Sequence, residues 1–191
     1  MSLNKDLVFD QLPISVQKSF NGLTAKHERI KPQTLLYKFT DWEIFNTGFD
    51  KNGNSIESTS AFWGTMDDLI DVLYYCKKTN KTLLDCVRQR NAVLHNWNGL
   101  NSLLIIRVVQ EEIYGFTGNI GPQTEKGHAK AGKTYATKHF TSAIAFWGGA
   151  SQVYLPGLQR QHIAEVVPAE TVLIRDKVEA ILDFLNNLVL V

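Results

Sequence analysis

The sequence predicts one α+β domain within its 191 residues, because strand patterns and helical patterns come in separate groups along the chain. A strand pattern at Thr34–Phe39 comes first, two amphipathic helical patterns follow it, and strand patterns return from Leu103. A hydrophobic content of 44% and a charged content of 20% are those of a globular domain that buries a core. We therefore expect an N-terminal arm over 1–33 and a single domain over 34–191.

The composition disfavours several classes of function. The formal net charge is +1 without a long basic run, so nothing indicates nucleic-acid binding. No apolar run approaches the about 20 residues of a membrane span, so no membrane partner is expected. The first residues, MSLNKDLVFDQL, lack the apolar core of a secretory signal. This predicts folding in the cytoplasm and leaves export as an effector, without a cleaved leader, open.

The cysteines and histidines do not form a metal-binding pattern. Cys76 and Cys86 have no CxxC spacing, and the five histidines are far apart in the sequence. We expect no metal site, and we favour two reduced, packed thiols over a disulfide between neighbouring helices.

The first strand carries a lysine among bulky apolar residues. Alternation along Thr34–Phe39 places Lys38 on one face and Tyr37 on the other. Lys38 has two interpretations: its ammonium reaches water from a strand end, or it enters a cleft and binds an anionic ligand. The sequence leaves both open.

Two helices are predicted after a short polar-to-aromatic stretch that contains Ser60. Thr65 is placed as the N-cap of the first helix, which closes at two lysines. The second helix is predicted over Lys81–Asn96, with Asn91 on its apolar or buried stripe and with Arg88 and Arg90 on its wetter sides.

The second half of the chain returns to strands. Leu103–Val109 is nearly all apolar, as in a central strand, and Glu112–Thr117 is a further strand candidate. His162–Val167 is the last predicted strand, and Pro168 separates it from a helical stripe within Glu170–Val191.

A turn that ends at Gln123 leads into a long polar loop. Thr124–Lys138 holds two glycines and four lysines with almost no apolar periodicity. A loop of this length inside a compact domain is typical of a functional lid.

The stretch Phe146–Pro156, FWGGASQVYLP, offers the best candidate ligand site. Gly148 and Gly149 indicate a tight turn or a close approach to the backbone, and the strand after them presents Gln152 and Tyr154 on one face. A neutral amide beside a phenol suits holding a ligand better than abstracting a proton. The alternative is a loop followed by an ordinary edge strand.

The order of these motifs resembles the ADP-ribosyltransferase-like superfamily, which includes bacterial toxin domains that transfer ADP-ribose or hydrolyse NAD. The motifs are LLYKF, then STSAFW, then GGASQVYLP, and Tyr114–Gln123 is similar to an aromatic-glycine-glutamine stretch of some of these toxins. The resemblance covers Thr34–Val167. It implies a split, strongly bent antiparallel β core with intervening helices, followed by a C-terminal helix.

The resemblance also implies an NAD-cleaving toxin or effector domain, with NAD as the substrate. Gln152 then holds the reacting ribose, Lys38 orients the pyrophosphate, and Ser60 hydrogen-bonds near the nicotinamide ribose. A target protein and an inhibitor protein are further partners that it implies. The remaining residues expected to contact NAD are Tyr37, Phe62, Trp63, Phe116, Gln123, Gly148, Gly149 and Tyr154.

Two positions depart from the pattern of the superfamily. Lys38 stands where arginine or histidine is expected, so it would meet a phosphate as a point charge. Gln152 stands where a transferase has glutamate, and an amide lacks the full negative charge that stabilises an oxocarbenium-like transition state. These departures favour NAD hydrolysis, a weakened transferase or an inactive binding fold over a strong transferase.

Two other classes of function stay open from the sequence. One is a non-catalytic interaction module with a degenerate nucleotide pocket. The other is an enzyme that acts on nucleic acid through the lysines of the long loop, Lys126, Lys130, Lys133 and Lys138.

Overall fold

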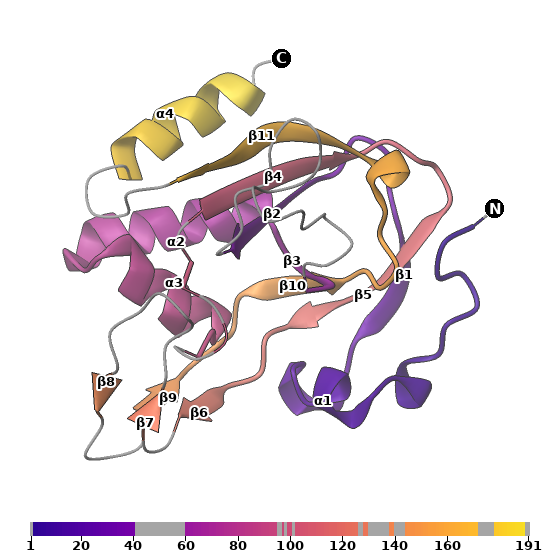
Figure 1. Cartoon of the computed structure of the whole chain (residues 1–191), viewed down its shortest axis with the longest axis horizontal. Helices are drawn as coiled ribbons and strands as arrows, with labels where there is room; N and C mark the ends of the chain where they lie inside the picture. The colour runs from indigo at the N-terminus through magenta and orange to yellow at the C-terminus, as the bar shows by residue number, and fades with distance from the viewer. Residues whose placement is uncertain are drawn as a thin grey trace.

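The computed structural model describes residues 2–40, 60–94, 97, 99–100, 102–125, 128–129, 138–139, 144–171 and 178–189. These residues form an α+β fold in which a curled antiparallel sheet carries helices on its outer side, and the C-terminal helix packs beside them (Figure 1). The α+β class predicted from the sequence is confirmed.

The described secondary structure is as follows. The strands are β1 Lys26–Ile30, β2 Leu35–Thr40, β3 Phe62–Thr65, β4 Ser102–Val108, β5 Ile113–Asn119, β6 Gln123–Glu125, β7 His128–Ala129, β8 Lys138–His139, β9 Ile144–Phe146, β10 Ser151–Tyr154 and β11 Ile163–Thr171. The helices are η1 Phe9–Gln11, α1 Ile14–Gln17, η2 Asn21–Leu23, α2 Met66–Thr79, α3 Leu83–Asn91, η4 Arg160–His162 and α4 Val178–Val189.

The main sheet has seven strands in the spatial order β1-β5-β10-β3-β2-β4-β11, and its neighbouring strands are antiparallel. β10 lies between β5 and β3, so it is an interior strand and not an edge strand. Gln152 therefore has a ladder partner on each side, Gly64 on β3 and Gly118 on β5.

One face of the sheet curls around a buried apolar cluster. Each of the seven strands contributes to this cluster, which requires the sheet to bend so that both of its edges approach one core. The strand residues in it are Ile30, Leu36, Trp63, Leu104, Ile106, Val108, Ile113, Val153 and Ile163.

The outer face is covered in two halves. Tyr37 and Phe39 of β2 pack in one cluster with α2, α3 and α4. On the other half, Phe20 packs with Phe116 of β5, and it belongs to the N-terminal segment, here defined as residues 2–25. Figure 1 shows α2 and α3 well apart from the turns of this segment. The two covers leave the middle of the outer face between them.

Several predicted elements are confirmed with small shifts at their ends, among them β2, α2, β4 and β5. Thr65 occupies the N-cap position of α2, but its hydroxyl does not cap a backbone N–H. The hydroxyl instead donates to the Asp68 carboxylate at 2.7 Å. The same carboxylate accepts the backbone N–H of Ser151 at 2.8 Å, which ties the start of β10 to α2.

The prediction for the second helix was wrong in two respects. α3 ends at Asn91, well before Asn96, because Ala92 adopts a left-handed conformation with φ of 47°. Arg88 is buried rather than on a wetter side, and its Nη1 donates to the carbonyl oxygens of Val93 and Leu94 at 3.1 and 3.0 Å. The guanidinium is thus used to satisfy carbonyl groups just after the end of α3.

The predicted break at Pro168 was also wrong, because β11 runs through it to Thr171. β11 is an edge strand, and its pairing with β4 shifts register twice around this proline. A residue without a backbone N–H is tolerated at such an edge. Conversely, one strand was not predicted from the sequence. β1 lies within the predicted arm and pairs with β5.

Part of the predicted lid lies outside the described residues. Of Thr124–Lys138, the structure describes the end of β6, β7 and Lys138. Lys126, Lys130 and Lys133 therefore lie outside the described residues, as do positions 41–59.

Candidate functional site

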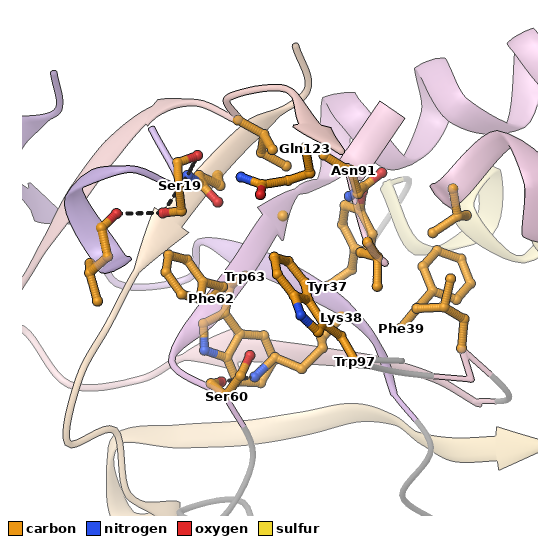
Figure 2. A pocket seen from close by; sticks show the side chains of 18 of the residues that line it. Ser19, Tyr37, Lys38, Phe39, Ser60, Phe62, Trp63, Asn91, Trp97 and Gln123 are labelled. Carbon is orange, nitrogen blue, oxygen red and sulfur yellow. Dashed lines mark hydrogen bonds between the residues drawn. The ribbon is translucent and has the colours of Figure 1, made fainter. Parts of the chain in front are cut away.

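A cavity of about 430 Å³ opens between the two covers of the outer face. One wall comes from the N-terminal segment, the opposite wall comes from α3 and the residues after it, and β2, β3 and β10 supply the floor. Figure 2 shows Ser19 on one side of the cavity and Asn91 on the other. Its lining residues are Ser15, Val16, Ser19, Tyr37, Lys38, Phe39, Ser60, Phe62, Trp63, Gly64, Val87, Asn91, Ala92, Val93, Trp97, Leu100, Ile120, Gln123 and Gln152.

The floor is built on one row of residues across three strands. Gly64 of β3 pairs with Tyr37 of β2 on one side and with Gln152 of β10 on the other. A Cβ atom at Gly64 would overlap the Tyr37 ring, so glycine is required for this ring to lie over β3. The row therefore brings a phenol and an amide to the same floor.

Lys38 lies where β2 and β3 separate. The described pairing of these strands ends at Tyr37 and Gly64, and beyond it the Lys38 ammonium donates to the backbone carbonyl of Ser60. The same nitrogen lies 3.9 Å from the centroid of the Trp63 ring, and Figure 2 shows the three side by side. Burial lowers the pKa of Lys38 to about 7, because removal of the ammonium from water disfavours its charged form. An anion next to it would restore the charged form.

Gln152 is held by the N-terminal segment. The residue is only 5% exposed, and its amide nitrogen donates to the backbone carbonyl of Ser19 at 2.9 Å. The same nitrogen lies 3.3 Å from the Ser19 hydroxyl, which in turn donates to the carbonyl of Val16 at 2.6 Å. Gln152 and Ser19 are 133 positions apart in sequence, so the cavity forms only in the complete tertiary fold.

Tyr37 is fixed from the opposite wall. Its hydroxyl accepts a hydrogen bond from the Asn91 amide nitrogen at 2.8 Å, and burial raises the pKa of the phenol far above its ordinary value. The phenol stays neutral at physiological pH. It acts here as a fixed polar group rather than as an acid or base.

The glycine turn lies outside the cavity. The Gly148 N–H donates to the carbonyl of Gln89 at 2.9 Å, and the Gly149 N–H donates to the carbonyl of Ile120 at 2.9 Å. Both glycines have positive φ values, 69° and 86°. The close approach indicated by the two glycines is therefore a contact of the turn with α3 and with Ile120, the residue after β5.

The structure brings together most of the residues singled out in the sequence. Lys38, Ser60 and Gln152 line the same cavity, together with Tyr37, Phe62, Trp63 and Gln123. Phe116 and Tyr154 instead belong to the cluster under the N-terminal segment, where Tyr154 packs on Phe62 at a ring distance of 4.8 Å. A role of these residues in NAD binding stays a prediction.

Sequence reasoning missed four of the lining residues that matter most for the polarity of the cavity and for the access of a ligand to it. Ser15 and Ser19 come from the segment taken as an arm, and Trp97 is 59% exposed beside the cavity. Asn91 was placed only on the buried stripe of a helix. A buried position occupied by an amide was the one signal in the sequence that pointed to it.

The chemical character of the lining is mostly apolar and uncharged. Among the described lining residues, none is aspartate or glutamate, and Lys38 is the one with a cationic side chain. Within the described part of the chain, no group of three or more histidine, cysteine or acidic side chains could hold a metal ion. The helices described in the structure include none of the length and hydrophobicity that a membrane crossing needs.

Comparisons with known proteins give little further information. No protein-family model and no curated protein matches the sequence. The solved structure of Rhs1-CT in complex with its cognate immunity protein RhsI1 aligns with a TM-score of 0.42 and 12% sequence identity. The alignment covers 77% of this chain and 80% of that chain. A similarity at this level assigns neither a fold family nor a function.

Proposed function

We propose that this chain binds NAD in the cavity and cleaves the bond between nicotinamide and ribose, with water as the main acceptor. In this reaction a water oxygen bonds to the anomeric carbon of the ribose. The electron pair of the broken bond passes to the nicotinamide nitrogen, and the water releases one proton. The products are ADP-ribose and nicotinamide.

The observation that carries this proposal is the convergence of Lys38, Ser60 and Gln152 on one cavity. The three residues come from β2, from the residues before β3 and from β10. The motif order in the sequence singles out the same three residues. Wide separation of the three in the fold would have removed the basis of the proposal.

The cavity also has the size and character of a small-molecule site. Its volume of about 430 Å³ falls within the range of small-molecule sites, roughly 300–1,000 Å³. Phe62 and Trp63 supply aromatic side chains to the lining, which favours stacking of a base of NAD. In the proposed complex Lys38 meets the pyrophosphate, and the negative charge raises its pKa above the value of about 7 that it has in the free protein.

The absence of a carboxylate among the described lining residues limits the expected rate. A carboxylate beside the ribose would stabilise positive charge as the glycosidic bond breaks, whereas an amide contributes only a dipole. We therefore expect slow hydrolysis. The same observation favours a second candidate, a domain that binds NAD without cleaving it.

The first experiment incubates the purified protein with NAD and follows free nicotinamide. Gln152→Ala and Lys38→Met are tested alongside, and Lys78→Met serves as the matched control because Lys78 is an exposed lysine at the end of α2. We expect release by the native protein and by the control, and a loss of at least about tenfold in each cavity variant, equivalent to about 1.4 kcal/mol of transition-state stabilisation.

Calorimetry with NAD separates the remaining outcomes. Binding without nicotinamide release would replace cleavage by the non-catalytic candidate. If the protein neither releases nicotinamide nor binds NAD, the NAD proposal is wrong and the cavity takes another ligand or partner.

A toxin or effector role is part of the same proposal and rests on the resemblance described for the sequence. It implies a target protein as an alternative acceptor of ADP-ribose and an inhibitor protein that covers the cavity. Expression of the native chain in bacteria, compared with the Gln152→Ala variant, tests this role. Growth arrest and NAD depletion are expected with the native chain alone, and equal growth of both strains would contradict it.

A further inference from the structure

Gln152 occupies a position at which the fold itself dictates the orientation of the side-chain amide. The atom facing its nitrogen is the backbone carbonyl oxygen of Ser19, at 2.9 Å. A carbonyl oxygen only accepts hydrogen bonds, so the amide must present its NH₂ group to Ser19. The contact thereby fixes which end of the amide is the nitrogen.

The Ser19 carbonyl is itself anchored by the backbone. It also accepts the N–H of Gly121 at 2.8 Å, and the next residue, Phe20, forms a bridge with Ile120. The Phe20 ring is fully buried against Phe116. The carbonyl therefore stays in place whatever side chain stands at position 152.

The other end of the amide carries the functional consequence. Because the amide nitrogen of Gln152 is directed at Ser19, the amide oxygen Oε1 is directed away from Ser19. Among the described residues, no donor hydrogen-bonds to this oxygen, and it is not one of the fully buried unpartnered atoms. Gln152 lines the cavity, so its free acceptor belongs to the cavity.

We infer that Ser19 is a positioning residue that turns Gln152 so that the cavity presents a hydrogen-bond acceptor to a hydroxyl or amine of the ligand. Position 152 is thus built for an amide and is not a weakened glutamate site. The identification of this ligand group as a ribose hydroxyl rests on the proposed function. The orientation of Gln152 does not.

The Gln152→Glu substitution would place a carboxylate oxygen against the Ser19 carbonyl, acceptor against acceptor. Only a protonated carboxyl group could donate there, so the pKa of the introduced carboxyl group should be raised in the folded state. The unfavourable contact is then present above that raised pKa and is relieved as the pH falls through it. An amide has no such pH dependence.

The decisive experiment compares the melting temperatures of the native protein, Gln152→Glu and Gln152→Leu from pH 5 to pH 8. At pH 8 we expect Gln152→Glu to melt roughly 5–10 °C below the native protein, and at pH 5 to recover at least half of this difference. Gln152→Leu, with neither donor nor acceptor, should show a difference from the native protein that does not change with pH.

Other titratable groups face this region, and the comparison controls for them. They are Tyr37 and Lys38 on β2 and Asp68 on α2, which accepts the Ser151 N–H, and Lys18 precedes Ser19 in the chain. The leucine variant contains all of them, so its pH profile reports their contribution. A Gln152→Glu protein as stable as the native one at pH 8, or a deficit that stays constant with pH, would overturn the inference.

NAD binding is measured on the same proteins and separates this inference from the proposed function. If the pH profile is as expected and NAD does not bind, the orientation of Gln152 stands and NAD is the wrong ligand. If NAD binds equally well to the native protein and to Gln152→Leu, the cavity takes NAD but the acceptor at position 152 is not used, and the inference falls.

Discussion

Tyr37 and Gln152 lie on two strands that do not pair with each other, yet both have Gly64 as their partner. Because Gly64 has no side chain, the Tyr37 ring fits above β3, the strand that lies between β2 and β10. Each of the two polar groups is then fixed from a different cover of the sheet, Tyr37 by Asn91 and Gln152 by Ser19. The cavity is therefore preorganised by contacts that its floor alone does not supply.

The hydrogen bond between Tyr37 and Asn91 should contribute measurably to stability. Tyr37→Phe removes it and leaves the Asn91 amide nitrogen without this acceptor, beside an oxygen, Oδ1, that is buried and unpartnered within the described part of the chain. We expect a loss of about 1–3 kcal/mol in the free energy of unfolding. Urea unfolding measures it. Tyr154→Phe is the matched control, since its half-buried hydroxyl has no hydrogen-bond partner in the described residues, and an equal loss there would contradict the assignment.

Lys38 should make stability depend on pH in an identifiable direction. Its folded pKa of about 7 lies below the ordinary value of 10.5, so between these values the unfolded chain binds more protons than the folded one. The cost of burying the charge is fully present below pH 7 and is relieved as the pH rises above it. The stability advantage of Lys38→Met over the native protein should shrink by on the order of 2–3 kcal/mol between pH 7 and pH 9. Urea unfolding at both pH values tests this, and a constant advantage would show that Lys38 keeps its charge.

The two glycines before β10 should differ in their tolerance of a side chain. Both need a positive φ, but a Cβ atom at Gly148 would lie 2.5 Å from the Ile120 carbonyl oxygen, whereas one at Gly149 would meet no atom within 4 Å. Gly149→Ala should cost only the backbone strain, about 1–2 kcal/mol. Gly148→Ala should cost clearly more, because overlap adds to the same strain. Thermal unfolding of the pair gives the order, and the reverse order would refute a packing role for the turn.

The two cysteines should be unreactive in the folded protein. Both thiols are free and buried, and burial raises the pKa of Cys86 to about 11 and that of Cys76 above its usual range. Because the thiolate is the reactive form, modification by a disulfide reagent at pH 8 should be slow and should accelerate at least about a hundredfold in denaturant. Rapid labelling of the native protein, followed by mass spectrometry, would show that the region around α2 and α3 opens readily.

The sequence predicted the elements whose pattern is set by burial on one or two faces. β2 and β4 are rich in apolar residues, and α2 combines acidic residues at its start with lysines at its end. β1 escaped prediction because four of its five residues are polar or charged, and Ile30 is its one buried residue. Its strand conformation comes from pairing with β5, which local sequence does not encode.

The residues of the candidate site were likewise only partly predictable from the sequence. Lys38 stands out because it lies among bulky apolar strand residues, and Gln152 stands out because it follows a pair of glycines at the start of a strand. Both features are visible in a single sequence. Ser19 lies in a polar segment where a serine is unremarkable, and its importance arises from a contact across 133 positions. Asn91 likewise acquires its role only when α3 packs over β2.

The central place of β10 has a consequence for the order in which the chain acquires its site during synthesis. In the finished sheet β10 alone joins the pair β1 and β5 to the strands β3, β2 and β4, so a chain without residues 151–154 would have no strand between these two parts. Insertion of β10 closes the gap and delivers Gln152 to Ser19 in the same step. A chain that lacks β10 therefore lacks part of the cavity floor, and whatever chemistry the cavity performs requires β10 to be in place.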